Sequence, residues 1–243
     1  MIPEHEIDDD LIMQTVDHAI DAFYQGLFNK VDNIKLKELL KRKNPYLFYA
    51  KNIRSVDEIV DNLLSATISS SEETIFGNEF FEPIAIAASG GHKAGSEGVD
   101  IEIVTNDSMI VIAVKSGPSV FNADSRKRQE QNFQSIQKRA QQGKLVYYPI
   151  IGYGYGKKAK KADRPYTELY GQEFWEAITG DSEFYLKILD YMSDKPRKYR
   201  EEFTELMADT RNRLIRDFSN QFCNEDGSID WVKLLKFNSG KEE

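Results

Sequence analysis

Two short apolar runs joined by a polar turn constrain the fold of this chain more than any other feature. The runs cover residues 99–104 and 109–114, and the turn between them centres on Asn106 and Asp107. Runs of this length that are rich in Val and Ile and bounded by turn residues are typical of strands. The segment therefore predicts a β-hairpin whose two strands are as apolar as strands of a hydrophobic core.

The charged side chains of this hairpin need an explanation, because burying a carboxylate without a partner is expensive. Asp100 and Glu102 are two residues apart in the first strand and therefore point to the same face, and Lys115 ends the second strand. If the strands pair so that Lys115 lies near Asp100, three charged groups meet at one sheet edge. Adjacent carboxylates repel unless a cation such as Mg²⁺ lies between them. A simple salt bridge between Asp100 and Lys115 is the plainer interpretation.

Helical patterns flank the hairpin on both sides. A third strand is expected over residues 145–151, where Pro149 places it near a sheet edge or a bulge. This order of elements predicts an α/β fold, in which a central mixed sheet is flanked by helices and extended by helices at both ends. Apolar periodicity and capping residues predict helices over 9–30, near 36–40, from Ser55, from Ser70 to Pro83, and over 125–142, 168–178, 181–193, 197–221 and 229–236.

The composition is that of a folded chain with a sizeable core. Apolar residues make up 40% of the sequence and include 14 Phe, so the chain is not a disordered one. The single cysteine, Cys223, excludes an internal disulfide framework and fits a reducing, cytoplasmic location. The first ten residues are acidic and lack the basic and apolar regions of a signal peptide. No apolar run approaches the roughly 18 residues of a membrane span.

The charge of the chain is unevenly distributed. The net charge is −8, which by itself argues against a nucleic-acid partner. Between Lys115 and Arg164, however, there are twelve Lys or Arg residues and three acids. Such a segment can bind phosphates through counterion release whatever the total charge. The plainer interpretation is a solvated helix followed by a basic loop.

Three segments carry a resemblance to a known group of enzymes. Asp100, a gap of fourteen residues and then Lys115 on the next strand, followed by a basic helix, resemble the PD-(D/E)XK nuclease superfamily. KSGPSVFNADSRKRQEQNF, from Lys115, is similar to the KSGP-x-x-x-N segment of type II restriction endonucleases, nearest to the PmeII-type family. KNPYLFYAKNI at 43–53 and ELYGQEFWEAITGDSEFY at 168–185 also resemble that family. The resemblance covers about residues 43–192.

The resemblance implies a function and an organisation. It implies Mg²⁺-dependent hydrolysis of phosphodiester bonds in double-stranded DNA by a homodimer, with Mn²⁺ as a possible substitute. Asp100 matches the metal-binding aspartate of the superfamily, and Lys115 matches its core lysine. The whole chain is then expected to form one restriction-endonuclease-like domain, with a helical part over 1–68, the nuclease core over 69–165 and a second helical part over 166–243.

Ala113 departs from the superfamily pattern, which has Asp or Glu two residues before the lysine. Another carboxylate is needed there if the site is active. Glu102 is the first candidate because it shares the strand face of Asp100, and Glu79 is the second because a glutamate on the preceding helix often completes the metal shell in this superfamily. Glu73 and Glu82 are weaker candidates. The alternative is a DNA-binding protein with a degenerate nuclease core, in which Ala113 marks lost chemistry.

The basic segment and its neighbouring loops supply the candidate DNA-binding residues. A tight turn at Gly117 and Pro118 is expected to let Ser116 and Asn122 face a phosphate. The loop can equally serve only to reverse the chain. The predicted DNA-binding residues are Lys93, Ser116, Asn122, Arg126, Lys127, Lys157 and Lys158.

Overall fold

The computed structural model of this chain describes residues 2–157 and 164–241. The chain divides into two compact units, which are described separately below. The sheet unit consists of Met1–Phe23 and Phe76–Pro196, and the helical unit consists of Tyr24–Ile75 and Arg197–Glu243. None of the helices in the described residues combines the length and the apolar character that a membrane crossing requires.

The sheet unit is built on a five-stranded mixed sheet with the order β1-β2-β3-β4-β5. β1, β2 and β3 pair antiparallel, whereas β3, β4 and β5 pair parallel. The predicted α/β fold with a central mixed sheet flanked by helices is therefore confirmed. The strands are β1 (His92–Lys93), β2 (Ile101–Val104), β3 (Ser108–Lys115), β4 (Val146–Tyr153) and β5 (Thr167–Tyr170).

The predicted hairpin forms β2 and β3 at the centre of this sheet. Its turn is closed by the Thr105 hydroxyl, which accepts the backbone N–H of Ser108 at 3.0 Å and donates to the Asp107 carboxylate at 2.8 Å. This turn fixes the register, in which Glu102 lies opposite Val111. The register places the end of β3 beside the start of β2, as the sequence pattern required.

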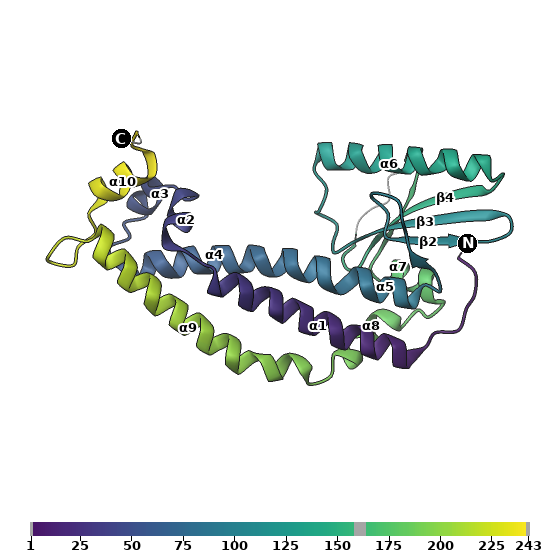
Figure 1. Cartoon of the computed structure of the whole chain (residues 1–243), viewed down its shortest axis with the longest axis horizontal. Coiled ribbons are helices and arrows are strands. Elements are labelled where there is room, and N and C mark those ends of the chain that lie inside the picture. The colour runs from purple at the N-terminus through teal and green to yellow at the C-terminus, as the bar shows by residue number, and fades with distance from the viewer. Residues whose placement is uncertain (1, 158–163, 242–243) are drawn as a thin grey trace. The chain divides into compact units, whose positions relative to one another are not determined.

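Helices cover both faces of the sheet (Figure 1). α6 (Ala123–Gln142) packs on β4 and buries Phe133 and Ile136, so the predicted amphipathic helix is confirmed. It begins at Asn122, whose side chain accepts the backbone N–H of Ser125 in a capping box. α5 (Glu82–Ala88) and α7 (Gln172–Thr179) pack on β3 and β5 and on each other. α8 (Phe184–Met192) packs on α7.

The helix before the hairpin differs from the prediction. α4 (Val56–Phe76) runs unbroken through Ser70, which does not begin a new helix. The Ser71 hydroxyl donates to the Thr67 carbonyl, so it bonds back into the helix and does not cap a new one. A π-helical turn, η1 (Gly77–Phe81), follows, and α5 then begins with Pro83 in its first turn, where a missing N–H costs little.

The structure bears on two predictions about the later strands. β4 lies between β3 and β5, so the strand as a whole is internal to the sheet. Pairing with β5 begins only at Ile150, so the part of β4 that contains Pro149 is locally an edge, as predicted. The predicted helix at 168–178 begins at Gln172, because residues 167–170 form β5.

The helical unit has its own apolar core, to which Leu40, Leu63, Leu214 and Phe218 contribute. α3 was not predicted; Asn44 accepts the backbone N–H of Tyr46, and Pro45 occupies the first turn, so this pair begins a helix. The helices that contribute to this unit are α1 (Asp9–Asp32), α2 (Leu36–Lys41), α3 (Pro45–Ala50), α4, α9 (Lys195–Phe222) and α10 (Trp231–Ser239).

Candidate active site

Asp100 and Lys115 meet at the edge where β2 begins and β3 ends. The Asp100 Oδ2 atom accepts the backbone N–H of Val114 at 2.6 Å and lies 3.6 Å from the Lys115 Nζ atom. Lys115 Nζ also donates to the Val114 carbonyl at 2.8 Å. Both side chains keep about a quarter or less of their surface exposed. The predicted proximity of these two residues is therefore present in the structure.

The positive charge around Asp100 only partly balances the negative charge of its carboxylate. Burial raises the pKa of its carboxyl above the usual range, although the charge of Lys115 and the Val114 hydrogen bond act in the opposite direction. A carboxylate whose pKa stays raised beside a lysine is only partly compensated. The site can therefore accept a further cation.

The acid of the preceding helix that lies near Asp100 is Glu82 rather than Glu79. The charge of Glu82 adds to the raised pKa of Asp100, and its carboxylate binds Lys93 at 3.1 Å. Glu79 lies in the π-helical turn and is exposed. Of the two, the structure brings Glu82, the weaker candidate of the sequence pattern, into the electrostatic environment of Asp100.

Glu102 has a different partner. Its carboxylate binds the Arg139 guanidinium of α6, and the residue is only 9% exposed. In β2 it lies two residues beyond Asp100, a separation of about 7 Å along a strand, and opposite Val111 rather than Lys115. The structure therefore does not bring Glu102 together with Lys115.

Ala113 lies in the apolar cluster between the sheet and α6. It is fully buried, and Tyr153 and Phe133 belong to the same cluster. An acid at this position would be buried among apolar side chains. The residue that departs from the superfamily pattern thus completes a packed core in this chain.

The carboxylate of Asp100 is the kind of group that holds Mg²⁺ together with a substrate phosphate. Within the described residues, no group of three or more His, Cys, Asp or Glu is placed to hold a metal, so Asp100, Glu102 and Glu79 do not form the predicted set. Mg²⁺ is commonly held by one or two carboxylates together with substrate phosphates. Asp100 is one such hard oxygen donor, and Glu82 is an acid of the preceding helix whose charge acts on it.

A second cluster of charges surrounds Glu168 in β5. Its carboxylate accepts from the Arg126 guanidinium at 3.0 Å and from the Tyr153 hydroxyl at 2.9 Å, and it lies 3.6 Å from Arg164 Nε. The Arg126 guanidinium also donates to the Tyr166 hydroxyl at 3.0 Å. The cluster ties the start of α6 to β4 and β5.

The negative charge of Glu168 is balanced by its hydrogen-bond and ion-pair partners. Burial alone would raise the pKa of its carboxyl, but the hydrogen bonds from Arg126 and Tyr153 and the charge of Arg164 lower that pKa below the usual range. The sequence analysis missed this cluster because it assigned Glu168 to a helix. The alternation in Thr167-Glu-Leu-Tyr170, with a β-branched and an aromatic residue, is the signal that favours a strand.

Three of the predicted DNA-binding residues are engaged within the protein. Lys93 binds Glu82, and Asn122 caps α6. Arg126 binds Glu168 and lies 4.7 Å from the ring centre of Phe121. Asn122 and Arg126 therefore hold the loop and helix that follow Lys115, whereas Lys93 links β1 to α5.

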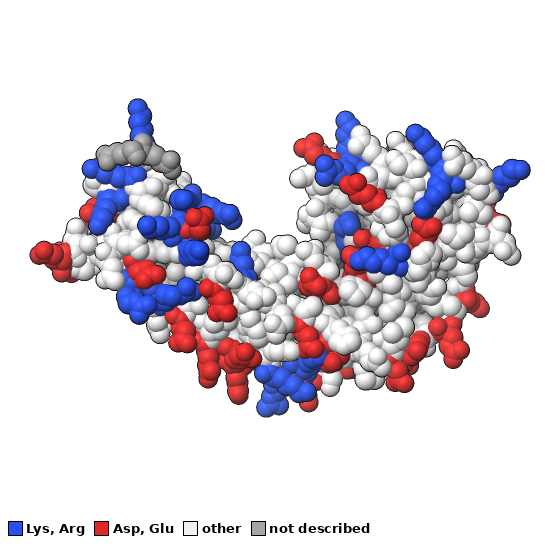
Figure 2. Space-filling model, viewed as in Figure 1, with Lys and Arg blue, Asp and Glu red and all other residues white. Residues whose placement is uncertain are grey.

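The remaining predicted DNA-binding residues differ in exposure. Ser116 is half-buried against Gly77, whereas Lys127 and Lys157 are exposed. Lys158 lies outside the described residues. Figure 2 shows Lys and Arg side chains projecting over α6, with acidic side chains among them. Lys127 and Lys157 are therefore accessible to a phosphate backbone.

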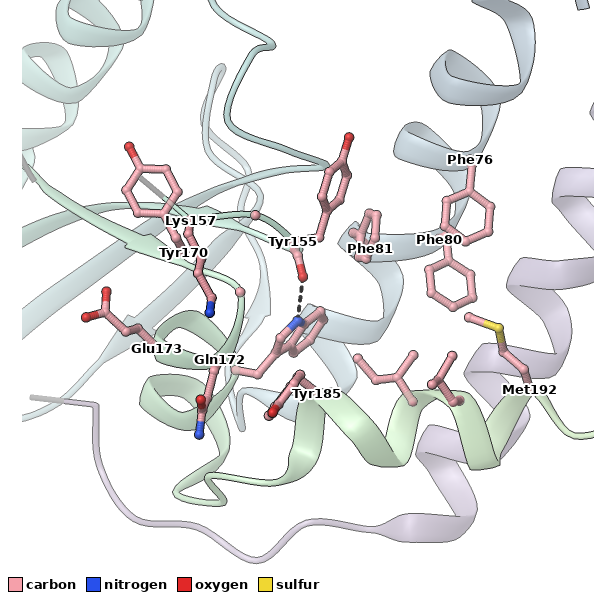
Figure 3. Close-up of a pocket in the computed structure, with 16 residues that line it drawn as sticks. Phe76, Phe80, Phe81, Tyr155, Lys157, Tyr170, Gln172, Glu173, Tyr185 and Met192 are labelled. Atoms are coloured by element: carbon pink, nitrogen blue, oxygen red, sulfur yellow. Dashed lines mark hydrogen bonds between the residues drawn. The ribbon is translucent and has the colours of Figure 1, made fainter. Parts of the chain in front are cut away.

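An aromatic cavity of about 670 Å³ adjoins the residue that follows Lys115. Tyr155 lines this cavity and donates its backbone N–H to the Ser116 carbonyl at 3.0 Å. The Tyr155 ring lies so close to Gly117 that a side chain there would collide with it. Lys157 lies at the opposite end of the cavity from Phe80 (Figure 3). The lining is mainly aromatic and aliphatic, so the cavity can take a flat apolar group.

Comparisons with known proteins give a family assignment. The family model of the type II restriction endonuclease EcoO109I matches residues 10–200 of this chain. A search of curated proteins finds no match. The matched region contains Asp100, Lys115 and Glu82 and spans well over half of the 243 residues. The chain therefore belongs to the EcoO109I family of type II restriction endonucleases.

Proposed function

We propose that this protein hydrolyses phosphodiester bonds in double-stranded DNA in a Mg²⁺-dependent reaction, as a site-specific type II restriction endonuclease. The observation that carries this proposal is the Asp100–Lys115 pair, in which a partly buried carboxylate with a raised pKa lies beside an ammonium group. Perturbed groups of this kind gather at catalytic sites. The family of the chain supplies the reaction class.

Each residue of the site has a chemical task in this proposal. Asp100 and Glu82 would hold the metal, which when bound supplies Lewis-acid stabilisation of charge on the phosphate. Lys115 Nζ, held by the Val114 carbonyl and by Asp100, would orient the attacking water and stabilise negative charge that develops on phosphorus oxygens. Glu102 and Glu79 would take no direct part.

DNA binding would rest on exposed cations around this edge. Lys127 and Lys157 would contact phosphates, which position the duplex without reading its sequence. Lys93, Asn122 and Arg126 would act by fixing the surrounding backbone. Loops and helices that contact base edges would carry the specificity.

A homodimer is the expected assembly. The described residues of one chain contain one Asp100–Lys115 pair, and cleaving both strands of a duplex at one site requires two such pairs. The finer relationship to the PmeII-type family also stays a prediction.

The proposal is tested by incubating phage DNA with Mg²⁺ and either the wild-type protein or a Lys115→Ala variant. Discrete fragments from the wild type alone are expected. Mn²⁺ replaces Mg²⁺ in a parallel series. DNA binding without cleavage at every metal concentration would contradict the proposal and favour the degenerate DNA-binding alternative, whereas a smear would indicate a nuclease without site specificity.

A further inference from the structure

We propose that a basic groove on the helical unit is a second docking surface for the phosphate backbone of duplex DNA. This inference rests on the proposed function, which makes DNA the partner. The groove has a volume of about 400 Å³ and lies between the end of α1, the helix α2 with the segment that follows it, and the second half of α4. Its charged lining residues are Lys30, Lys35, Glu38, Arg42 and Lys43.

The cations of the groove lack ion-pair partners among the residues that the structure describes. Among the described residues, none of Lys30, Lys35, Arg42 and Lys43 forms an ion pair. The one acid of the lining, Glu38, lies 3.6 Å from Lys41. Four like charges around one hollow repel each other, so the groove is suited to an anion.

Another surface of the same unit shows that unpaired cations are not the rule there. Arg211 of α9 binds Asp61 at 2.6 Å and Asp57 at 3.1 Å. These acids lie on α4, the helix that also forms one wall of the groove. Acids on one part of α4 therefore neutralise a cation of α9, whereas beside another part of α4 four cations have no ion-pair partner among the described residues.

The floor and the wall of the groove suit a phosphate. Ile34 and Leu39 form part of the lining and are 4% and 8% exposed, so the cations project from a packed base. Ser70 lines the wall and is exposed, which adds a hydroxyl donor. Phosphate oxygens in DNA complexes accept hydrogen bonds from Lys, Arg and Ser side chains alike.

An extended polyanion fits this surface better than a single small anion. Residues 30–54 contain eight Lys or Arg and two acids. Figure 2 shows Lys and Arg side chains gathered in the area of α2 and α3, with a few acidic side chains among them. Duplex DNA presents one negative charge per about 1.7 Å of its axis, so it can engage several of these cations at once.

The test compares two triple variants of the full chain with equal loss of charge. The groove variant carries Lys30→Gln, Lys35→Gln and Arg42→Gln. The control carries Lys198→Gln, Lys233→Gln and Lys236→Gln, which are exposed residues of the same unit outside the groove. Fluorescence anisotropy with a short labelled duplex, in EDTA and over a series of KCl concentrations, gives Kd and its salt dependence.

The groove variant is expected to bind at least about tenfold more weakly than wild type, with the slope of log K against log salt reduced by about 2 to 3. The control is expected to stay within about twofold of wild type, because exposed charges far from phosphates are screened. Equal affinity for the two variants would overturn the proposal. If circular dichroism shows that the groove variant is misfolded, the single variants Lys35→Gln and Arg42→Gln replace it, each with an expected slope change of about 1.

Cleavage assays separate this proposal from the proposed function. If the wild type binds DNA through the groove but never cuts it, the proposed function fails and the groove proposal holds. If the wild type cuts DNA while the groove variant binds like the control, the groove proposal alone fails.

Discussion

Asp100 and Glu168 are two shielded carboxylates of one sheet unit, and the protein shifts their pKa values in opposite directions. Asp100 has a single lysine at 3.6 Å, and the nearby Glu82 adds negative charge. Glu168 has Arg126 at 3.0 Å, Arg164 at 3.6 Å and a tyrosine hydroxyl. Burial raises the pKa of Asp100, whereas hydrogen bonds and charges outweigh burial and lower the pKa of Glu168.

The difference separates a candidate reaction site from a structural cluster. A carboxylate that the fold already satisfies has little to gain from a further cation, so Glu168 serves best as a structural tie. A carboxylate that the fold leaves partly uncompensated is stabilised when a cation binds. A substitution of Asp100 should therefore lower activity more than stability, and a substitution of Glu168 should lower stability more than activity.

The largest effect is expected for Asp100→Asn. The amide can still accept the Val114 N–H, but it cannot supply a charged metal ligand, so cleavage should fall at least about 10³-fold, the scale of losing a principal catalytic group. In EDTA the variant should be at least as stable as wild type, because a partly buried and only partly compensated charge is removed. Cleavage assays and urea unfolding measure the two effects. A clear loss of stability would show that the ion pair between Asp100 and Lys115 mainly stabilises the fold.

Glu168→Ala should show the reverse pattern. Removing one partner of a buried charge cluster leaves Arg126 and Arg164 uncompensated, and such changes cost about 3–5 kcal/mol of unfolding free energy. Trp175 belongs to the sheet unit and Trp231 to the helical unit, so a Trp231→Phe background makes fluorescence report on the sheet unit alone.

Tyr153→Phe is the matched control for Glu168→Ala, because it removes one hydrogen bond from an uncharged donor to the same carboxylate. It should cost about 1.5–3 kcal/mol, less than the loss of the carboxylate itself. Equal losses for the two variants would mean that the charges of the cluster contribute little.

Glu82→Gln should weaken the response to Mg²⁺. If Glu82 shares the metal with Asp100, the Mg²⁺ concentration for half-maximal cleavage should rise about 10–100-fold, as is typical when a group that supports a metal site is lost. Glu79→Gln, on the same stretch of helix but exposed, serves as the control and should change it less than about twofold. The opposite ranking would restore Glu79 as the helix ligand.

The pH dependence of stability should differ between the wild type and the Glu168→Gln variant. Because the folded-state pKa of Glu168 lies below its ordinary value of 4.5, its ionised form stabilises the fold above that pH, and this contribution is lost as pH falls through the folded-state pKa. The difference in unfolding free energy between wild type and Glu168→Gln should therefore be greatest near neutral pH and shrink below about pH 4.5. A difference that grows with acidification would contradict the assignment.

The sequence predicted the part of the site that depends on local pattern. The two strands of the hairpin have strong β signals and a short turn, so their register, and with it the proximity of Asp100 and Lys115, followed from the sequence. The Glu168 cluster could not be found in this way. It joins β4, β5 and the start of α6, and the spacing of residues along the chain does not show which strands pair.

The choice between Glu79 and Glu82 was also beyond the sequence. Both residues follow a long helix, and an α-helical period predicts which face each one occupies. The π-helical turn at Gly77–Phe81 changes that phase, because its residues advance by a smaller angle per step than in an α-helix. Ala113 likewise drew attention as a missing acid, whereas the fold shows it as a packed core residue.

The smallest effect is expected for Lys127→Gln, which concerns DNA binding rather than cleavage or stability. Arg126 is held by Glu168, but its neighbour Lys127 is exposed and free to contact a phosphate. Its loss should weaken binding of a duplex up to about fivefold, the range of one exposed charge contact, and lower the salt slope by about 1. Lys138→Gln lies on the same face of α6 but three turns further from Lys115, and it should leave both values near wild type. Equal effects at the two positions would mean that α6 attracts DNA only through its overall charge, and the edge that holds Asp100 and Lys115 would lose its special place in binding.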